Sequence, residues 1–256
     1  MIREDESTVA ARLAGASLLV TGASGFLGKA VLATWLREVP DSGPVLVALR
    51  AADDDAARQR LLDGVLTSDV FGPFDGGELE AAVAEGRLRA VAVDLVADDL
   101  GGLDPAVLAG VDVVIHCAAS VSFEQPLDEM IELNVRGPLR LLDALDRSGG
   151  HPHVVHVSTA YAAGRRVGLV PEVPSGQGPG EPWVDRDAEL AAARAWRRDL
   201  DVVSRQPEHE RRFVADAREE LGPSGNLRVG AQAELNRLTW IARQLTERGR
   251  ERARAL

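Results

Sequence analysis

Short apolar runs alternate with segments of helical periodicity through residue 158 of the chain. Five runs are nearly continuous in apolar residues, as in strands buried on both faces; they cover residues 17–22, 43–50, 87–95, 111–119 and 153–159. Apolar residues recur at helical spacing over 26–39 and 129–147, where Pro138 is a candidate site for a bend. This order predicts the α/β class, with a doubly wound parallel sheet covered by helices on both sides.

The pattern changes after residue 160. Residues 160–182 are rich in Gly and Pro and predict a loop, whereas the sequence from 183 onward consists of helix formers dense in Arg and Glu. The stretch 222–226, Gly-Pro-Ser-Gly-Asn, separates two helical segments. The second segment has an apolar stripe at helical spacing, formed by Leu235, Leu238, Ile241 and Leu245. We therefore expect a sheet domain over 1–165, a loop over 166–182 and a helical insertion over 183–256, where a substrate region would begin.

A glycine-rich turn links the first predicted strand to the first helix. Gly22, Gly25 and Gly28 are spaced three apart. A phosphate loop of the nucleoside-triphosphatase type is excluded, because the residue after Lys29 is Ala30 and lacks the hydroxyl that would bind magnesium. A glycine turn between strand and helix instead predicts dinucleotide binding, with the diphosphate at the helix N-terminus. The expected contact residues are Thr21, Gly22, Ser24, Gly25, Phe26, Leu27 and Gly28.

The end of the second predicted strand indicates which dinucleotide binds. An acidic residue there is typical of NAD, and an arginine is typical of the 2′-phosphate of NADP. This strand ends in Arg50, while Asp53, Asp54 and Asp55 lie beyond its end. The sequence favours NADPH, the alternative being that Arg50 is only a solvated charge at a strand end.

Composition narrows the classes of partner and site. The net charge of -11 disfavours nucleic acid. One cysteine permits no internal disulfide, and the sequence has neither a secretory signal nor an apolar run of the roughly 18 residues that a membrane span needs. We expect a cytoplasmic protein.

Three histidines near the fifth predicted strand raise the question of a metal site. His151 and His153 would lie on one face of the strand and His156 on the other, so their side chains would not converge and no metal site is expected. The oligomeric state is not predicted.

Four phrases together resemble a known family: VTGASGFLGKAVL, VIHCAASVSF, NVRGPLRLLD and HVSTAYAAG, all within residues 17–164. They are similar to the extended short-chain dehydrogenase/reductase superfamily, and more narrowly to the Rossmann-type NAD(P)-binding domain of fatty acyl-CoA reductases, the male sterility type. The resemblance implies an NADPH-dependent reductase of fatty acyl-CoA that forms an aldehyde or an alcohol. It also implies further site residues: Asp94 and Leu95 against the adenine, Cys117, Ala118 and Ala119 along the ribose side, Asn134 ordering the active-site helix, and Thr159 as the catalytic hydroxyl with Ser158 behind it.

The superfamily's Tyr-x-x-x-Lys pair has no counterpart in the chain. The one tyrosine, Tyr161, comes too early, Arg165 stands where the lysine would follow it, and the one lysine is Lys29. We therefore expect an N-terminal portion of a longer reductase, which binds NADPH with little or no turnover. Three alternatives stay open: a sugar-nucleotide epimerase or dehydratase, a hydroxysteroid-type dehydrogenase, and a non-catalytic NADP-binding sensor. The helical insertion would carry paired charges and shape an acyl-chain or CoA entrance, with Trp183, Trp196 and Trp240 as packing or lid residues.

Overall fold

A computed structural model describes residues 8–74, 77–122, 124–159, 168–170, 172 and 184–255. The chain forms two compact units. The first comprises Met1–Ala119 and Leu133–Gly164, and the second comprises Ser120–Glu132 and Arg165–Leu256. The domain boundaries expected from the sequence, at 165 and 182, stay predictions. The assignment of 120–132 to the second unit was not expected, because this segment is far from the helical insertion along the chain.

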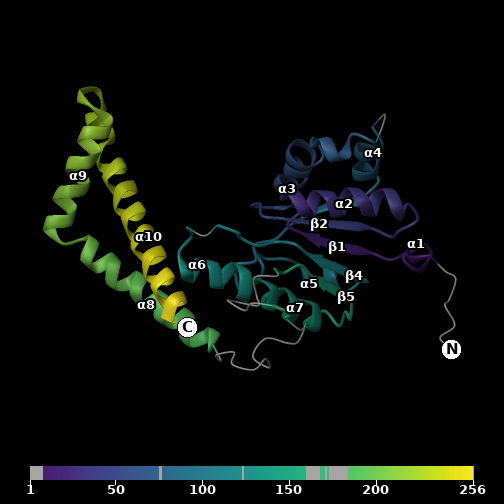
Figure 1. The fold of residues 1–256 in the computed structure, drawn as a ribbon. Coiled ribbons are helices and arrows are strands. Elements are labelled where there is room, and N and C mark those ends of the chain that lie inside the picture. Colours follow the sequence, from purple (N-terminus) through teal and green to yellow (C-terminus); the bar gives the residue numbers. More distant parts are fainter. Residues whose placement is uncertain are drawn as a thin grey trace. The chain divides into compact units, whose positions relative to one another are not determined.

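The first unit is built on a five-stranded parallel sheet (Figure 1). Its strands are β1 (Leu18–Thr21), β2 (Val45–Leu49), β3 (Leu88–Ala92), β4 (Val113–His116) and β5 (His153–His156). Their spatial order is β3-β2-β1-β4-β5. The chain adds strands on one side of β1 up to β3 and on its other side from β4 onward, as in Rossmann-type folds. All five predicted strands are present, so the prediction of a doubly wound α/β sheet is confirmed.

Helices cover both faces of this sheet (Figure 1). One face carries α2 (Phe26–Glu38), α3 (Asp54–Arg60) and α4 (Glu78–Ala84), with a π-helical turn η1 (Leu61–Val65) and a 3-10 turn η2 (Asp69–Phe71) between the last two. The other face carries α5 (Pro105–Leu108) and α7 (Gly137–Arg147). Alternate residues of each strand feed the two cores, so Leu18 and Val20 pack on the α2 side and Leu19 on the α7 side. A short helix, α1 (Val9–Arg12), precedes the sheet.

The helix expected over 129–147 is present, since helical residues continue without a gap from Leu127 to Arg147. It comprises α6 (Leu127–Ile131), a π-helical turn η3 (Glu132–Arg136), and α7. Pro138 is the second residue after this π-helical turn, so the irregularity of the helix lies next to the residue named as a candidate site for a bend. Strand β5 was expected to be buried on both faces, but all four of its residues are exposed, so that part of the prediction is wrong.

The second unit contains α6, α8 (Arg186–Ser204), α9 (Pro207–Leu221), a 3-10 turn η5 (Pro223–Arg228) and α10 (Val229–Ala255). Gly222 ends α9 with φ +62, as the helix stop in the sequence predicted. The break between α8 and α9 at 205–206 was not predicted. It follows from Pro207, which occupies the first turn of α9.

The apolar stripe of α10 is only half buried. Ile241 and Leu245 pack with Leu200 of α8, and Trp196 and Trp240 lie against them. Leu235 and Leu238, expected in the same stripe, are 55% and 48% exposed, so that part of the prediction is wrong. Trp183 lies outside the described residues.

Ion pairs join the helices of the second unit, as expected for helices with paired charges. Arg237 of α10 pairs with Asp201 of α8 at 2.5 Å and with Glu234 of its own helix at 2.6 Å. Its guanidinium also donates to the Ser204 hydroxyl at 3.0 Å. These bonds raise the pKa of Arg237 and lower the pKa of both carboxyl groups. Arg197 joins α8 to α6 in the same way, through Asp128 and Glu129. Within the described part, no helix has the length and apolarity that crossing a bilayer would take.

Candidate nucleotide-binding site

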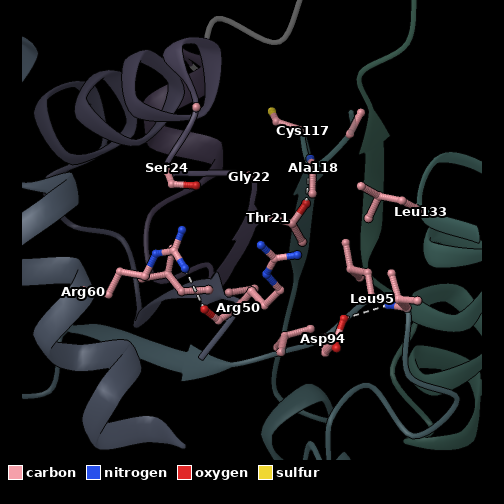
Figure 2. Close-up of a pocket in the computed structure, with 16 residues that line it drawn as sticks. Thr21, Gly22, Ser24, Arg50, Arg60, Asp94, Leu95, Cys117, Ala118 and Leu133 are labelled. Atoms are coloured by element: carbon pink, nitrogen blue, oxygen red, sulfur yellow. Dashed lines mark hydrogen bonds between the residues drawn. The ribbon is translucent and has the colours of Figure 1, made fainter. Parts of the chain in front are cut away.

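A cavity of about 310 Å³ opens at the carboxyl ends of β1, β2, β3 and β4 (Figure 2). Ligands of doubly wound sheets bind at this edge, near the point where the strand order reverses. Every lining residue belongs to the first unit. The lining residues are Thr21, Gly22, Ser24, Gly25, Ala48, Leu49, Arg50, Arg60, Val93, Asp94, Leu95, Val96, Cys117, Ala118, Ala119 and Leu133.

Two glycines of the turn after β1 have no room for a side chain. Gly22 has φ +72, and a Cβ there would lie 2.6 Å from the backbone nitrogen of Ala118. A Cβ on Gly28 would lie 2.2 Å from the carbonyl oxygen of Gly22. These contacts bring α2 tightly against the end of β1, and the Gly25 N–H closes the turn by donating to the Gly22 carbonyl at 2.9 Å.

Gly25 lines the cavity and, unlike Gly22 and Gly28, has room for a side chain. A Cβ there would meet only the Gly22 carbonyl oxygen, at 3.3 Å. Gly25 is the N-cap of α2, and no side chain caps this helix end. The first N–H groups of a helix lack intrahelical partners, so those of Phe26 and Leu27 are free of such bonds. An uncapped helix N-terminus behind a glycine is suited to hold an anionic group, such as a diphosphate.

The structure brings ten of the sixteen site residues predicted from the sequence to this cavity. Phe26, Leu27 and Gly28 follow it in the first turn of α2, and Asn134 follows the lining residue Leu133 in η3. Ser158 and Thr159 follow β5, and both are exposed, but neither lines the cavity. Tyr161 and Arg165 lie outside the described residues. The roles assigned to these side chains stay predictions.

Six lining residues were missed from the sequence: Ala48, Leu49, Arg60, Val93, Val96 and Leu133. Ala48 and Leu49 close β2, and Val93 and Val96 flank predicted residues beside β3, so adjacency to the strand ends was an available signal. Arg60 directly precedes the π-helical turn η1, and Leu133 lies within the π-helical turn η3. The sequence carries no simple signal for such turns.

Two arginines stand together at the end of β2. Arg60, the last residue of α3, donates from its Nη1 to the carbonyl oxygen of Arg50 at 2.8 Å, as Figure 2 shows. The acidic residues beyond the strand have other partners. Asp53 caps α3 by accepting from the Ala56 N–H at 2.8 Å, and Asp54 accepts from the Ala92 N–H at 2.7 Å. Neither aspartate lines the cavity, so the charged side chains that line it at the end of β2 are those of Arg50 and Arg60.

A buried imidazole lies behind the cavity wall. His116 is 2% exposed, and its Nδ1 lies 2.9 Å from the Thr21 hydroxyl. The same hydroxyl oxygen accepts from the Ala118 N–H at 3.2 Å, so the Thr21 side chain bonds both the imidazole and the backbone after β4. Burial, and secondarily His156 stacked at 5.3 Å between ring centroids, lowers the pKa of His116 to about 4. A neutral His116 at the end of β4 thus bonds to Thr21 at the end of β1, and Thr21 in turn holds the loop after β4.

Neither Cys117 nor Lys29 has the surroundings of a reactive group. Burial raises the pKa of the Cys117 thiol, so it stays protonated at neutral pH. Lys29 lies on α2 and is not among the residues that line the cavity.

Residues 20–220 match the model of the protein family described as male sterility protein. Fatty acyl-CoA reductase 8 of Arabidopsis thaliana is 32% identical over 165 residues, which cover 62% of this chain and 33% of the relative. Fatty acyl-CoA reductase 2 of Homo sapiens is 31% identical over 159 residues, which cover 61% and 30%. The alcohol-forming fatty acyl-CoA reductase of Simmondsia chinensis is 30% identical over 178 residues, which cover 67% and 36%. The chain spans about one third of the length of these curated relatives.

A solved structure shares the fold. The terminal R domain from the myxalamid PKS-NRPS biosynthetic pathway aligns over 63% of this chain and 39% of its own, with a TM-score of 0.51 and 23% identity. Together with the strand order, this likeness supports the Rossmann-type assignment of the first unit.

Proposed function

The chain belongs to the male sterility family of extended short-chain dehydrogenases/reductases, the family of the fatty acyl-CoA reductases, and we propose that its cavity binds NADPH in preference to NADH. The match covers the NAD(P)-binding domain of that family. Family membership supports a nicotinamide dinucleotide as the ligand, and the choice of NADPH is argued from this chain's own residues.

The observation that carries the choice is the pair of guanidinium groups at the end of β2. Arg50 and Arg60 both line the cavity, and a hydrogen bond links the Arg60 side chain to the Arg50 backbone. The 2′-phosphate of NADPH carries nearly two negative charges, which two arginines can bind through charge-assisted hydrogen bonds. NADH has a 2′-hydroxyl at this position, which a carboxylate binds better by accepting its hydrogen bond. The carboxylates that follow β2 along the chain do not line the cavity: Asp53 caps α3, and Asp54 accepts from the Ala92 N–H.

The turn after β1 supports the position of the diphosphate. The backbone of Gly22, Ser24 and Gly25 lines the cavity beside the uncapped start of α2. Gly25 leaves open the space that a side chain would occupy. NADPH supplies a hydride when it is bound; the residues of this chain bind and orient it.

The preference is tested by measuring the dissociation constants of NADPH and NADH for the purified chain. Replacing Arg50 or Arg60 with Ala should weaken NADPH binding by about tenfold, since a charge-assisted hydrogen bond contributes about 1.5 kcal/mol or more. NADH binding should change by less than about twofold. Arg58→Ala is the matched control, because Arg58 is exposed on α3 and does not line the cavity. Equal or tighter binding of NADH by the unmodified chain would contradict the proposal.

Gly25→Val tests where the diphosphate binds. The fold has room for a side chain at this position apart from one 3.3 Å contact, so the variant should keep the native circular dichroism spectrum. Binding of both NADPH and NADH should fall by more than about a hundredfold, because the valine would occupy the space of the phosphate. A folded variant that binds either dinucleotide normally would place the diphosphate elsewhere.

We further propose that the protein acts in the reduction of a fatty acyl thioester, with Thr159 donating a hydrogen bond to the substrate carbonyl. The printed names of the relatives and the position of Thr159 beyond the carboxyl end of β5 support this role. The chain holds no lysine after Lys29. The Lys-assisted proton donor of the superfamily is therefore missing, and we expect NADPH binding with very slow oxidation when acyl-CoA is added.

A second candidate, favoured by the same missing lysine, is a non-catalytic NADP-binding sensor. The reductase and the sensor differ in whether added acyl-CoA causes NADPH to be oxidised. A reductase should show slow, acyl-CoA-dependent loss of absorbance at 340 nm that Thr159→Val abolishes. A sensor should bind NADPH and show no such loss.

A further inference from the structure

The segment between β4 and α7 leaves the wall of the cavity and returns to it. Residues 120–132 begin directly after Ala119 and end directly before Leu133, and both of these flanking residues line the cavity. Figure 2 shows Leu133 at the opposite side of the cavity from Arg60. The segment itself belongs to the second unit, whereas Ala119 and Leu133 belong to the first. Two parts of the cavity wall are therefore joined covalently to a segment of the helical unit.

Two arginines on one face of α8 hold this segment. Arg194 and Arg197 are three positions apart, so their side chains extend from the same side of the helix. Arg197 binds the Asp128 carboxylate of α6 through two nitrogens, with Nη2 donating to Oδ1 at 3.0 Å and Nε donating to Oδ2. Arg194 pairs with Glu132, the residue directly before Leu133. These bonds join α6 and the first residue of η3 to α8.

The bond between Arg197 and Asp128 is a buried one. The Asp128 side chain is 8% exposed, and both of its carboxylate oxygens accept from Arg197. Removing Arg197 would leave a buried carboxylate without this partner, which costs far more than breaking an ion pair at the surface. Thr246 of α10 holds the start of the same segment, since its hydroxyl donates to the Glu124 carbonyl oxygen at 2.7 Å. The position of α6 within the second unit is therefore strongly favoured over any other.

Helical continuity carries this position to the cavity. Helical residues run without a gap from α6 through η3 into α7. Leu133 comes five residues after Asp128, which is about 8 Å along the axis of an α-helix. It lies in the π-helical turn, and such turns occur frequently at functional sites. Backbone hydrogen bonds link successive turns of a helix, so a shift of α6 would move Leu133 with it.

We propose that Arg197 is a positioning residue for the bound dinucleotide, because it holds α6 and thereby fixes the Leu133 side of the cavity. This inference rests on the proposed function, since it takes a dinucleotide to fill the cavity. Coupling between two sites is reciprocal, so a ligand that favours this position of Leu133 also stabilises the contact between Arg197 and α6. NADPH and NADH should respond alike, because Leu133 is not part of the arginine pair that would distinguish them.

The first test measures the dissociation constants of NADPH and NADH for the full chain and for Arg197→Met, which removes the charge and keeps much of the length of the side chain. Binding of both ligands should weaken by about tenfold, a factor typical of coupled sites, while the circular dichroism spectrum stays native. Arg198→Met, at the neighbouring exposed arginine of α8, is the matched control and should change both constants by less than about twofold. A folded Arg197→Met chain with unchanged affinities, or with a loss confined to NADPH, would overturn the proposal.

Hydrogen exchange on the unmodified chain tests the same coupling if Arg197→Met does not fold. Saturating NADPH should slow exchange of the α8 amides around Arg197 by about the same factor of ten, although no residue of α8 lines the cavity. An ion pair with only a structural role would not respond to the ligand, so slower exchange confined to the segments that line the cavity would overturn the proposal. If the unmodified chain binds neither dinucleotide, the proposed function fails and this inference fails with it. Normal binding of NADPH that neither measurement connects to Arg197 overturns this inference alone.

Discussion

The buried imidazole of His116 makes the first unit sensitive to acid, and the size of the effect follows from its pKa. The pKa of histidine is 6.5 in its ordinary environment and about 4 in this fold. Between these two values the unfolded chain binds a proton that the native chain does not, so the free energy of unfolding falls as the pH is lowered. Above pH 6.5 both states are neutral at this residue and the term vanishes.

The magnitude is the pKa difference multiplied by about 1.4 kcal/mol per unit, which gives about 3 kcal/mol once the pH is below 4. Between pH 7 and pH 5 the same linkage relation gives a loss of about 2 kcal/mol. That loss is a large part of the 5–15 kcal/mol by which domains are typically stable. The effect should therefore be visible without strong acid.

The assay is urea unfolding at several pH values, for the unmodified chain and for His116→Gln, which can still accept from the Thr21 hydroxyl but does not titrate. Replacing Trp183, Trp196 and Trp240 with Phe leaves Trp35, buried in the first unit, as the fluorescent reporter. The two stability curves should run parallel above pH 7 and diverge by about 2 kcal/mol by pH 5, with the unmodified chain losing more.

Parallel curves down to pH 5 would refute the reasoning, because they would mean that His116 titrates alike in both states. Nuclear magnetic resonance offers a direct check on the native chain. The His116 ring should still be neutral at pH 5.

Other predictions concern single contacts. Gly28→Ala should cost at least about 3 kcal/mol in urea unfolding, because the new Cβ would lie 2.2 Å from a backbone oxygen that cannot move without shifting β1. Gly86→Ala, at a glycine with φ +75 and open space around it, is the control and should cost only about 1 kcal/mol. Arg237→Met should destabilise the helical unit by about 1–2 kcal/mol, followed by Trp240 fluorescence; the loss should shrink in 0.5 M salt, because Asp201 and Glu234 are about half exposed. A salt-independent loss would assign the effect to packing.

Local patterns in the sequence were sufficient for the sheet and its glycine turn. Each strand, and the turn from β1 to α2, is specified by residues within a few positions of one another, so apolar runs and glycine spacing predicted them. Arg50 was identified in the same way, from its place at a strand end. The missing Tyr-x-x-x-Lys pair is also a property of the sequence itself.

The burial of individual side chains depends on tertiary packing, which local sequence patterns do not describe. Leu235 and Leu238 repeat the spacing of Ile241 and Leu245, yet they stay about half exposed while the second pair is buried against Leu200 of α8. The residues of β5 are exposed although the apolar run around them predicted a buried strand, and no feature of these four residues reveals this.

The sequence by itself determined the order of the strands, the glycine turn and the arginine on which the proposed preference for NADPH depends, because each is set by neighbours along the chain. Only the tertiary structure brought Arg60 to Arg50, Thr21 to His116 and Arg140 to Leu95, the last two across 95 and 45 positions. Such contacts arise when strands align and helices pack onto them. The periodicity of a short segment does not indicate which residues from distant parts of the chain its side chains will contact.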